Sequence, residues 1–246
     1  MRSKPLIYKL LVWTIGLLGS IAPIAFAEAV SPQEQIQVYA SRVTGSLMLL
    51  RGEGFQKKHQ SALETDLQTL AAAMQRLPQS SDALRNAHLE LVVQIRRGVS
   101  FGPKEEDMPW RYPEELSKAL LAVLQEARQL APTDDSEVAA ELEYLAVQYL
   151  SRSYFGSFEI ARELPDTYLG QDERKLIPAI DAQLAPLHAK ADPEISSLLA
   201  RWGYLKSALS DLNSQSNTLQ SVSGRPFAPI TVYRHTRSFT EQWLAM

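Results

Sequence analysis

Apolar residues recur every three or four positions along most of the chain, which is the spacing that places them on one face of an α-helix. The most regular of these seams comprises Ile195, Leu198, Trp202, Leu205, Leu209 and Leu212. A second seam, which ends directly before Pro78, comprises Leu63, Leu67, Leu70, Met74 and Leu77. The pattern predicts amphipathic helices that bury these faces against one another.

Start and stop signals mark the first three helices. Ser31-Pro32-Gln33-Glu34 is a capping box, in which the serine hydroxyl accepts a hydrogen bond from a free backbone N–H while the glutamate reaches back. This first helix is expected to end at Gly52 and Gly54. The third is expected to begin near Ser81 and to close on Arg96-Arg97-Gly98, since basic residues in the last turn and a glycine beyond it favour a helix C-terminus.

Four or five further helices are predicted in the rest of the chain. Their start signals are Pro113, the Thr133–Glu137 stretch, Asp192-Pro193 and Pro229. The prolines at 178 and 186 interrupt a helical pattern over residues 165–190, which predicts one kinked helix or two short ones. Residues 214–224 form a polar stretch typical of a loop.

The fold class follows from these elements. No part of the chain beyond residue 27 shows sustained alternation of apolar and polar residues between hairpin turns, so no β-sheet is expected. The prediction is an all-α fold, an antiparallel helical bundle of about seven to eight helices in one domain, residues 28–246. The alternative is a sub-boundary in the loop near residues 98–112, with three helices before it.

The N-terminal segment has the layout of a secretory signal peptide. Three basic residues are followed by an uncharged run at residues 10–27, and Ala25-Phe26-Ala27 puts small residues at the positions that signal peptidase reads. We expect residues 1–27 to be removed and the protein to be exported to the periplasm. The alternative is a membrane tether formed by residues 10–27, since about 17 to 25 apolar residues span a bilayer, but Pro23 argues against it.

Charge and cysteine content narrow the function classes. Removal of residues 1–27 leaves 22 Lys and Arg against 28 Asp and Glu, a formal charge of −6. This balance argues against nucleic acid and anionic membranes as partners. The chain has no cysteine and therefore no disulfide or thiolate chemistry, so the domain must be held together by its core.

Motif searches return no catalytic, cofactor-binding or metal-ligating residue. None of the four histidines follows a glutamate by three positions, the spacing that puts two ligands on one helix face, and Gly-x-Ser-x-Gly is absent. A carboxylate pair formed between helices would leave no sequence motif. His88 lies on an apolar seam and is interpreted as a partly exposed edge residue, with Ala87 in the core position. The alternative for His88 is a buried pH switch.

Two aromatic clusters form the candidate interaction surface. The first, in the loop before Pro113, comprises Phe101, Met108, Trp110 and Tyr112, and the second, at the end of the fifth helix, comprises Tyr154, Phe155 and Phe158. Apolar side chains at such places either cap the bundle or remain available to a partner.

A local excess of basic residues marks the C-terminal region, at Arg225, Arg234, His235 and Arg237. Arginines bind carboxylate or phosphate groups through paired hydrogen bonds, or they pair with acidic faces of neighbouring helices. No site is assigned to these residues from sequence.

The sequence therefore favours a non-enzymatic, exported helical bundle of the cell envelope that binds a protein partner or a small ligand, as a sensing or accessory component. The alternative is an exported hydrolase with a carboxylate-based site between helices. No motif identifies the partner, the ligand or the oligomeric state.

Overall fold

The structure, a computed structural model, describes residues 30–130, 136–156, 167–212 and 227–246. These residues form eight α-helices and two short 3₁₀ helices, and no β-strand occurs among them. The α-helices are α1 (Pro32–Gly52), α2 (Lys57–Arg76), α3 (Asp82–Ser100), α4 (Tyr112–Gln129), α5 (Val138–Tyr154), α6 (Glu173–Leu184), α7 (Pro193–Leu209) and α8 (Pro229–Leu244). The 3₁₀ helices are η1 (Glu105–Asp107) and η2 (Ala185–Ala189). The expected all-α bundle of seven to eight helices is confirmed, whereas the expected signal peptide and the loop at 214–224 lie outside the described residues.

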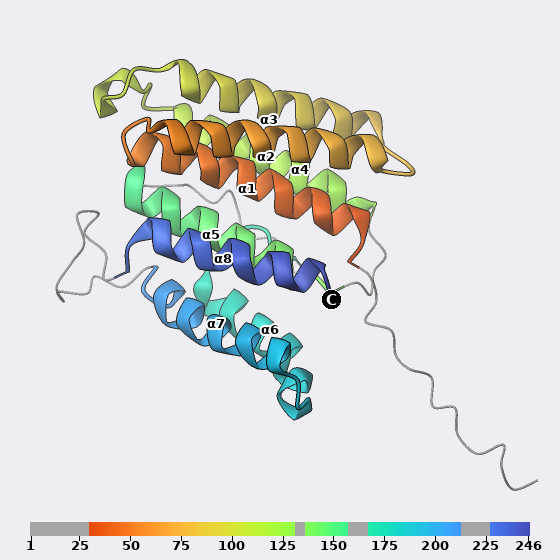
Figure 1. Cartoon of the computed structure of the whole chain (residues 1–246). Coiled ribbons are helices and arrows are strands. Elements are labelled where there is room, and N and C mark those ends of the chain that lie inside the picture. The colour runs from red at the N-terminus through yellow and green to blue at the C-terminus, as the bar shows by residue number, and fades with distance from the viewer. Residues whose placement is uncertain (1–29, 131–135, 157–166, 213–226) are drawn as a thin grey trace, which may run out of the picture.

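Two helices, α1 and α5, form the centre of the bundle. Figure 1 shows α2, α3 and α4 on one side of this pair and α6, α7 and α8 on the other. Every residue of α1 from 40 to 50 and every residue of α5 from 138 to 151 is buried. Because α1 contacts helices that come before and after residues 98–112, the helices on both sides of that loop share one core.

The start of α1 also organises the start of α5. Ser31 Oγ accepts the hydrogen bond from Glu34 N at 3.1 Å, as the capping box predicts. The carboxylate of Glu34 is buried and accepts hydrogen bonds from the backbone N–H groups of Ala139 and Ala140, at 3.1 and 3.4 Å. The N-cap residue of α5, Glu137, makes no side-chain capping bond, so α1 supplies a capping group for the first turn of α5.

The end of α3 differs from the prediction. Gly98 was expected to terminate this helix, but α3 continues to Ser100 and Gly98 lies inside it. A Cβ atom at Gly98 would overlap Tyr112 Oη and Leu47 Cδ2. The tyrosine hydroxyl lies over the helix here and donates to Gln94 O at 2.8 Å, so Gly98 serves close packing rather than helix termination.

The segment with two prolines is a helix followed by a short 3₁₀ turn. Pro178 lies inside α6, and Pro186 lies within η2, which follows α6 directly. Among the helices of the described segments, none combines the length and the apolar content that crossing a bilayer requires.

Candidate functional site

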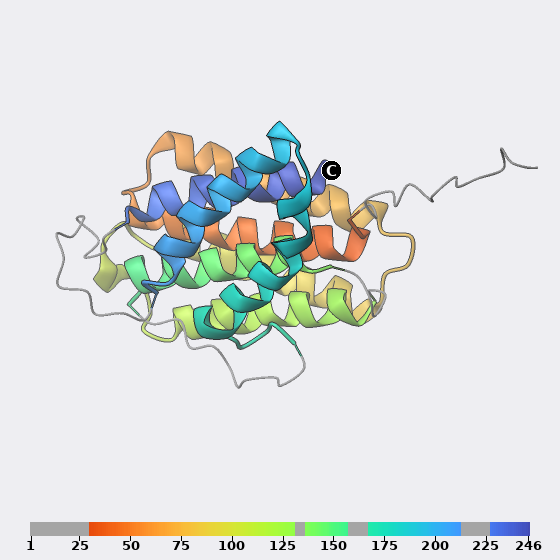
Figure 2. The same ribbon diagram turned by 90° about the horizontal axis from the view of Figure 1, so that it is seen from below.

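An open groove separates α2 and α8, which lie on the same face of the molecule (Figures 1 and 2). The groove has a volume of about 480 Å³. Its floor includes Ser46 and Leu49 of α1, and the α2 wall comprises Lys58, His59, Ala62, Thr65 and Asp66. The α8 wall comprises Ile230, Tyr233, Arg234 and Arg237. Apolar and cationic side chains therefore share one surface.

An ion pair joins the two walls deep in the groove. Arg237 donates from Nη1 to Asp66 Oδ2 at 2.6 Å and from Nη2 to Asp66 Oδ1 at 2.8 Å, and Ser46 Oγ donates to Asp66 Oδ2 at 2.5 Å. Asp66 is only 4% exposed. Burial lowers the pKa of Arg237, but Tyr233 and Asp66 outweigh this effect and raise it. Both oxygens of this carboxylate are therefore occupied by protein groups.

A second buried network lies behind this pair. Arg42 of α1 donates from Nε to Glu143 Oε1 of α5 at 2.7 Å and from Nη2 to Thr240 Oγ1 of α8 at 2.6 Å. Thr240 Oγ1 in turn donates to Glu143 Oε1 at 2.6 Å. Burial lowers the pKa of Arg42, but the charge and hydrogen bond of Glu143 more than offset burial and raise it. These bonds fix α8 on the two central helices, and with it the position of one groove wall.

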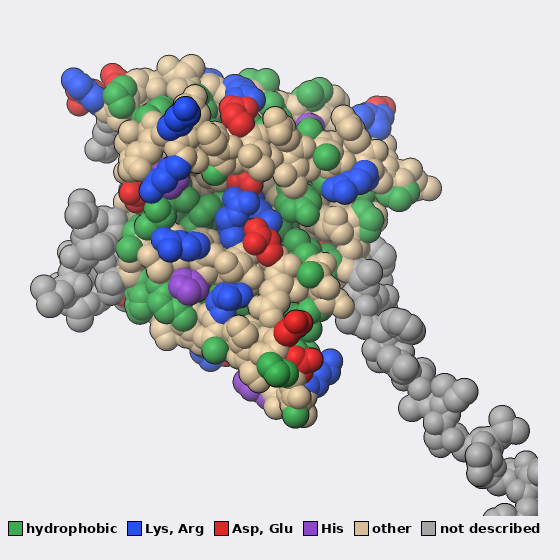
Figure 3. Space-filling view, viewed as in Figure 1, with side chains coloured by type: hydrophobic (Ala, Val, Ile, Leu, Met, Phe, Trp, Pro, Cys, Tyr) green, Lys and Arg blue, Asp and Glu red, His purple; other side chains and the backbone are tan. Residues whose placement is uncertain are grey.

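The rim of the groove carries two cations that no described carboxylate pairs with. Lys58 and Arg234 are exposed, and neither forms an ion pair with any carboxylate in the described part of the chain. Figure 3 shows Lys and Arg side chains gathered along the strip between α2 and α8. In a protein with an acidic balance overall, this strip favours anions.

A histidine completes the α2 wall of the groove. His59 is 8% exposed, and its Nε2 atom has no hydrogen-bond partner among the described residues. Burial and the charge of Lys58 lower the pKa of His59. The imidazole is therefore neutral at pH 7, and the positive charge of the groove comes from the lysine and the arginines.

A separate carboxyl group with a displaced pKa lies at the start of α5. Burial and the nearby charge of Glu137 raise the pKa of Glu141 to about 7. Gln183 of α6 donates to Glu141 Oε2 at 3.0 Å, while Glu137 is bound by Arg128 Nε at 2.7 and 3.0 Å. Glu141 is therefore a buried group that exchanges a proton near neutral pH.

This carboxyl group predicts a pH-dependent stability. Between about pH 4.5 and 7, Glu141 keeps its proton in the folded protein but loses it in the unfolded chain. The stability that protonated Glu141 contributes is therefore fully present below about pH 4.5 and is lost as the pH rises to 7. The wild type should therefore lose up to about 3 kcal/mol of stability between pH 5 and 8. Glu141→Gln has no carboxyl group to titrate, so its free energy of unfolding should rise by that amount relative to wild type over the same pH range. Urea unfolding of both proteins at the two pH values measures this gain.

An exposed glutamate provides the control for this prediction. The side chain of Glu106 is 75% exposed, so Glu106→Gln makes the same change of charge without altering a buried carboxyl group. Its stability difference from wild type should stay nearly constant between pH 5 and 8. A constant difference for Glu141→Gln as well would refute the displaced pKa.

The structure places both predicted aromatic clusters at the end of the bundle where α1 ends. Arg51 lies over the Phe101 ring at 5.9 Å, and Gly52 lies against the Tyr154 ring. Most of the described members cover the core: Phe101, Met108, Tyr154 and Phe155 are half-buried against it. Tyr112 is fully buried and begins α4 instead of lying in a loop, because it fills the space left by Gly98.

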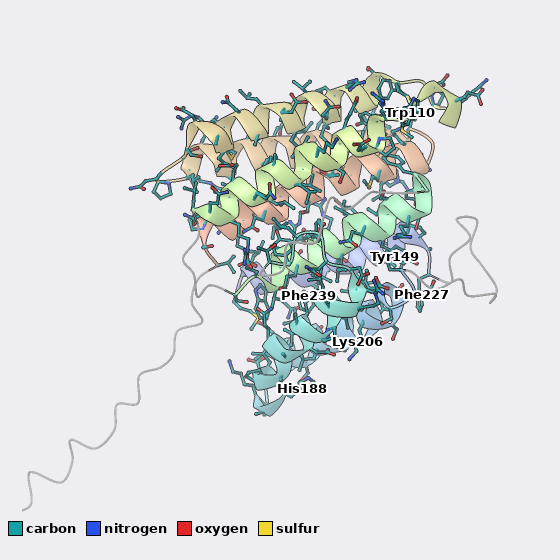
Figure 4. The ribbon with its side chains drawn as sticks, turned by 180° about the vertical axis from the view of Figure 1, so that it is seen from behind. Trp110, Tyr149, His188, Lys206, Phe227 and Phe239 are labelled. Carbon is teal, nitrogen blue, oxygen red and sulfur yellow. The ribbon has the colours of Figure 1, made fainter. Side chains whose placement is uncertain are left out.

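Trp110 is the exception in the first cluster. It is 80% exposed, lies at the end of the bundle formed by α3 and α4 (Figure 4), and is covered by Arg111, whose Cζ is 4.7 Å from the ring. Phe158 lies outside the described residues. A partner surface at these two clusters stays a prediction.

One of the two expected roles of the C-terminal basic residues is seen in the structure. Arg237 pairs with α2, as expected for a residue that holds helices together, whereas Arg234 lines the groove and forms no ion pair with a described residue. His235 packs on the Tyr204 ring at 4.5 Å, and Arg225 lies outside the described residues. His88 is half-buried, in agreement with an edge position, whereas Ala87, expected in the core position, is only half-buried against the core.

Sequence reasoning missed the α2 half of the groove. Lys58 and His59 resemble an ordinary polar helix start. Asp66 did leave a signal, because it falls on the apolar seam between Leu63 and Leu70, where a carboxylate requires a buried partner.

Comparisons with known proteins add nothing to this geometry. No protein family model, curated protein sequence or solved structure matches the chain. Within the described residues, no group of three or more His, Asp or Glu side chains has an arrangement that would hold a metal ion.

Proposed function

We propose that this protein is an exported, non-enzymatic helical bundle of the cell envelope that binds a small ligand in the groove between α2 and α8. The observation that carries the proposal is the groove itself, with a volume of about 480 Å³ and, at its rim, two cations that form no ion pair with any described residue. Small-molecule sites have volumes of roughly 300–1,000 Å³ and combine apolar walls with a few polar groups. Export rests on the layout of residues 1–27.

The bonding inside the groove supports binding over catalysis. Ser46 donates a hydrogen bond to Asp66, whose carboxylate is already neutralised by Arg237. A nucleophilic serine requires a base that takes its proton, and a carboxylate held in an ion pair is a weak base, so the hydroxyl instead helps to hold three helices together. The free groups, Lys58 and Arg234, are suited to attracting an anion.

Native mass spectrometry of the protein taken from the envelope fraction of its own cells tests this proposal. We expect a chain that begins at Glu28 and carries an additional retained mass. Ala62 is half-buried in the groove wall, so Ala62→Trp should fill the groove and abolish the retained mass. Ala72→Trp, at an exposed position of the same helix, should retain it.

The possible results separate the two parts of the proposal. An intact Met1 on membrane-bound protein would refute cleavage and release. A retained mass that survives Ala62→Trp would refute the groove as its site, and the absence of any retained mass would contradict a stably bound ligand. Circular dichroism of both tryptophan variants checks that they are folded.

A carboxylate-based hydrolase is the second candidate, and Glu141 is the observation that favours it. A carboxyl group with a pKa of about 7, four residues from Glu137 on the same helix, has the proton affinity of a general acid at neutral pH. Hydrolysis of a glycoside or ester panel by the wild type, abolished by Glu141→Gln, would support this candidate. Equal rates for the two proteins would remove it.

A further inference from the structure

We infer that the ligand of the α2–α8 groove is an amphiphilic anion, with a single carboxylate or phosphate head group at Lys58 and Arg234 and an apolar body against Leu49, Ala62, Ile230 and Tyr233. This inference rests on the proposed function, since it assigns a chemical class to the ligand of that site.

The two cations of the rim belong to helices that begin at the same end of the molecule. Lys58 is the second residue of α2 and Arg234 lies in the second turn of α8, and Figure 1 shows both helix starts at one end of the bundle. The N-cap residue of α2, Gln56, makes no side-chain capping bond, and the first turn of α2 contains no acidic residue. The helix dipole therefore adds to the positive potential that these two side chains create.

The carboxylate inside the groove does not cancel this potential. Asp66 is neutralised by Arg237 through two hydrogen bonds, so one negative and one positive charge are removed together. Among the residues that line the groove, the charges that remain are those of Lys58 and Arg234. A ligand without an anionic group would leave both cations without a counter-ion.

Four of the lining residues give the groove apolar surface beside these cations. Leu49 belongs to the floor, Ala62 and Ile230 face the groove from opposite walls, and the Tyr233 ring lies between the floor and α8. A compact inorganic anion at the rim would leave this surface in contact with water. A hydrocarbon body attached to the anionic head would cover it and gain the free energy of burying apolar area.

The competing ligand classes each leave one half of the groove unused. A purely polar anion pairs with the cations only, and a neutral apolar molecule contacts the apolar lining residues only. Both halves are filled by a molecule that carries one charged head and a short chain or ring system, so the two contributions should be separable in binding experiments.

Titration calorimetry on residues 28–246, the predicted mature chain, with four simple probes tests this inference. Octanoate and octyl phosphate carry both halves of the predicted ligand, acetate carries only a head group and 1-octanol only an apolar body. We expect octanoate and octyl phosphate to bind, with acetate and 1-octanol each weaker by roughly tenfold or more. The ratio of octanoate to octyl phosphate affinity then identifies which head group the rim prefers.

A matched pair of arginine variants locates the head group. Arg234→Ala should weaken octanoate binding roughly tenfold, the loss expected for a charged hydrogen-bond partner, while leaving 1-octanol binding unchanged. Arg111→Ala removes the same charge from an exposed residue outside the groove and should change neither. Unchanged octanoate binding in Arg234→Ala would overturn the assignment.

Each remaining result also decides the inference. If acetate binds as tightly as octanoate, the apolar residues contribute nothing to binding. If 1-octanol binds as tightly as octanoate, the cations contribute nothing. If none of the probes binds, the amphiphilic class is wrong. That failure is distinct from failure of the proposed function, because a native mass that Ala62→Trp removes would still establish the groove as a ligand site of another class.

Discussion

Replacing Glu143 with alanine should lower the free energy of unfolding by about 3 to 5 kcal/mol, because the change leaves a buried cation without its partner. Glu143 is fully buried and Arg42 is 5% exposed, and their ion pair is 2.7 Å long. After the substitution the Arg42 guanidinium keeps its bond to Thr240 but loses its neutralising charge. Urea unfolding followed by circular dichroism measures the loss.

A second glutamate beside the same arginine provides the control. Glu241 lies 3.7 Å from Arg42 Nη1 but is 58% exposed, and exposed ion pairs contribute roughly 0 to 1 kcal/mol. Glu241→Ala should therefore change stability by less than about 1 kcal/mol. Similar losses for the two variants would mean that burial of the Arg42 and Glu143 pair has no energetic consequence.

Replacing Trp202 with alanine should cost about 3 to 5 kcal/mol, the range for removing a large aromatic side chain from a core. Trp202 is 4% exposed, its ring centroid lies 6.4 Å from that of Phe239, and its indole N–H donates to Asp181 Oδ1 at 2.7 Å. The variant loses packing between α7 and α8 as well as this hydrogen bond. Thermal and urea unfolding both report the change.

Trp110 is the matched control for this substitution. It is 80% exposed and contacts the Arg111 guanidinium, so Trp110→Ala should cost at most about 1 kcal/mol. A loss for Trp202→Ala as small as that for Trp110→Ala would contradict the core position of the seam on α7.

The helices of this fold are predictable from sequence because their signals are local. The seams on α2 and α7 need only one helical turn of context, and the caps at Ser31 and Asp192 need three residues. The regularity of the seam that contains Trp202 reflects a helix with one buried face and one wet face. For such helices, periodicity alone identifies the buried side.

Periodicity and caps predict α1 and α5 as helices, but they do not reveal that these two form the centre of the bundle. A helix buried on all sides has no polar face to set its period, and Arg42 and Glu143 resemble solvent-facing residues when each helix is considered alone. The two residues lie 101 positions apart in the sequence. No local pattern pairs an arginine in α1 with a glutamate in α5, so the polar networks become visible only when the helices are assembled.

The groove was inaccessible to sequence reasoning for a related reason. Its walls belong to α2 and α8, which are separated by most of the chain, and its cations resemble ordinary surface residues. The basic residues near the C-terminus were noticed, but their number alone does not distinguish Arg237, which is paired with Asp66, from Arg234, which is not. That distinction depends on which residue of α8 faces Asp66.

The hydrogen bond between Arg42 and Thr240 affects when the chain can complete its folding during synthesis. It joins α1, the first described helix to be synthesised, to α8, the last, so the central arginine cannot acquire all its partners until the C-terminal residues are available. A chain that stops before α8 would keep the Arg42–Glu143 ion pair, but it would lack the Thr240 hydroxyl that bonds to both residues and would expose the flank of α5 that α8 covers. Chains truncated before α8 should therefore be cut by proteases more readily than the full chain.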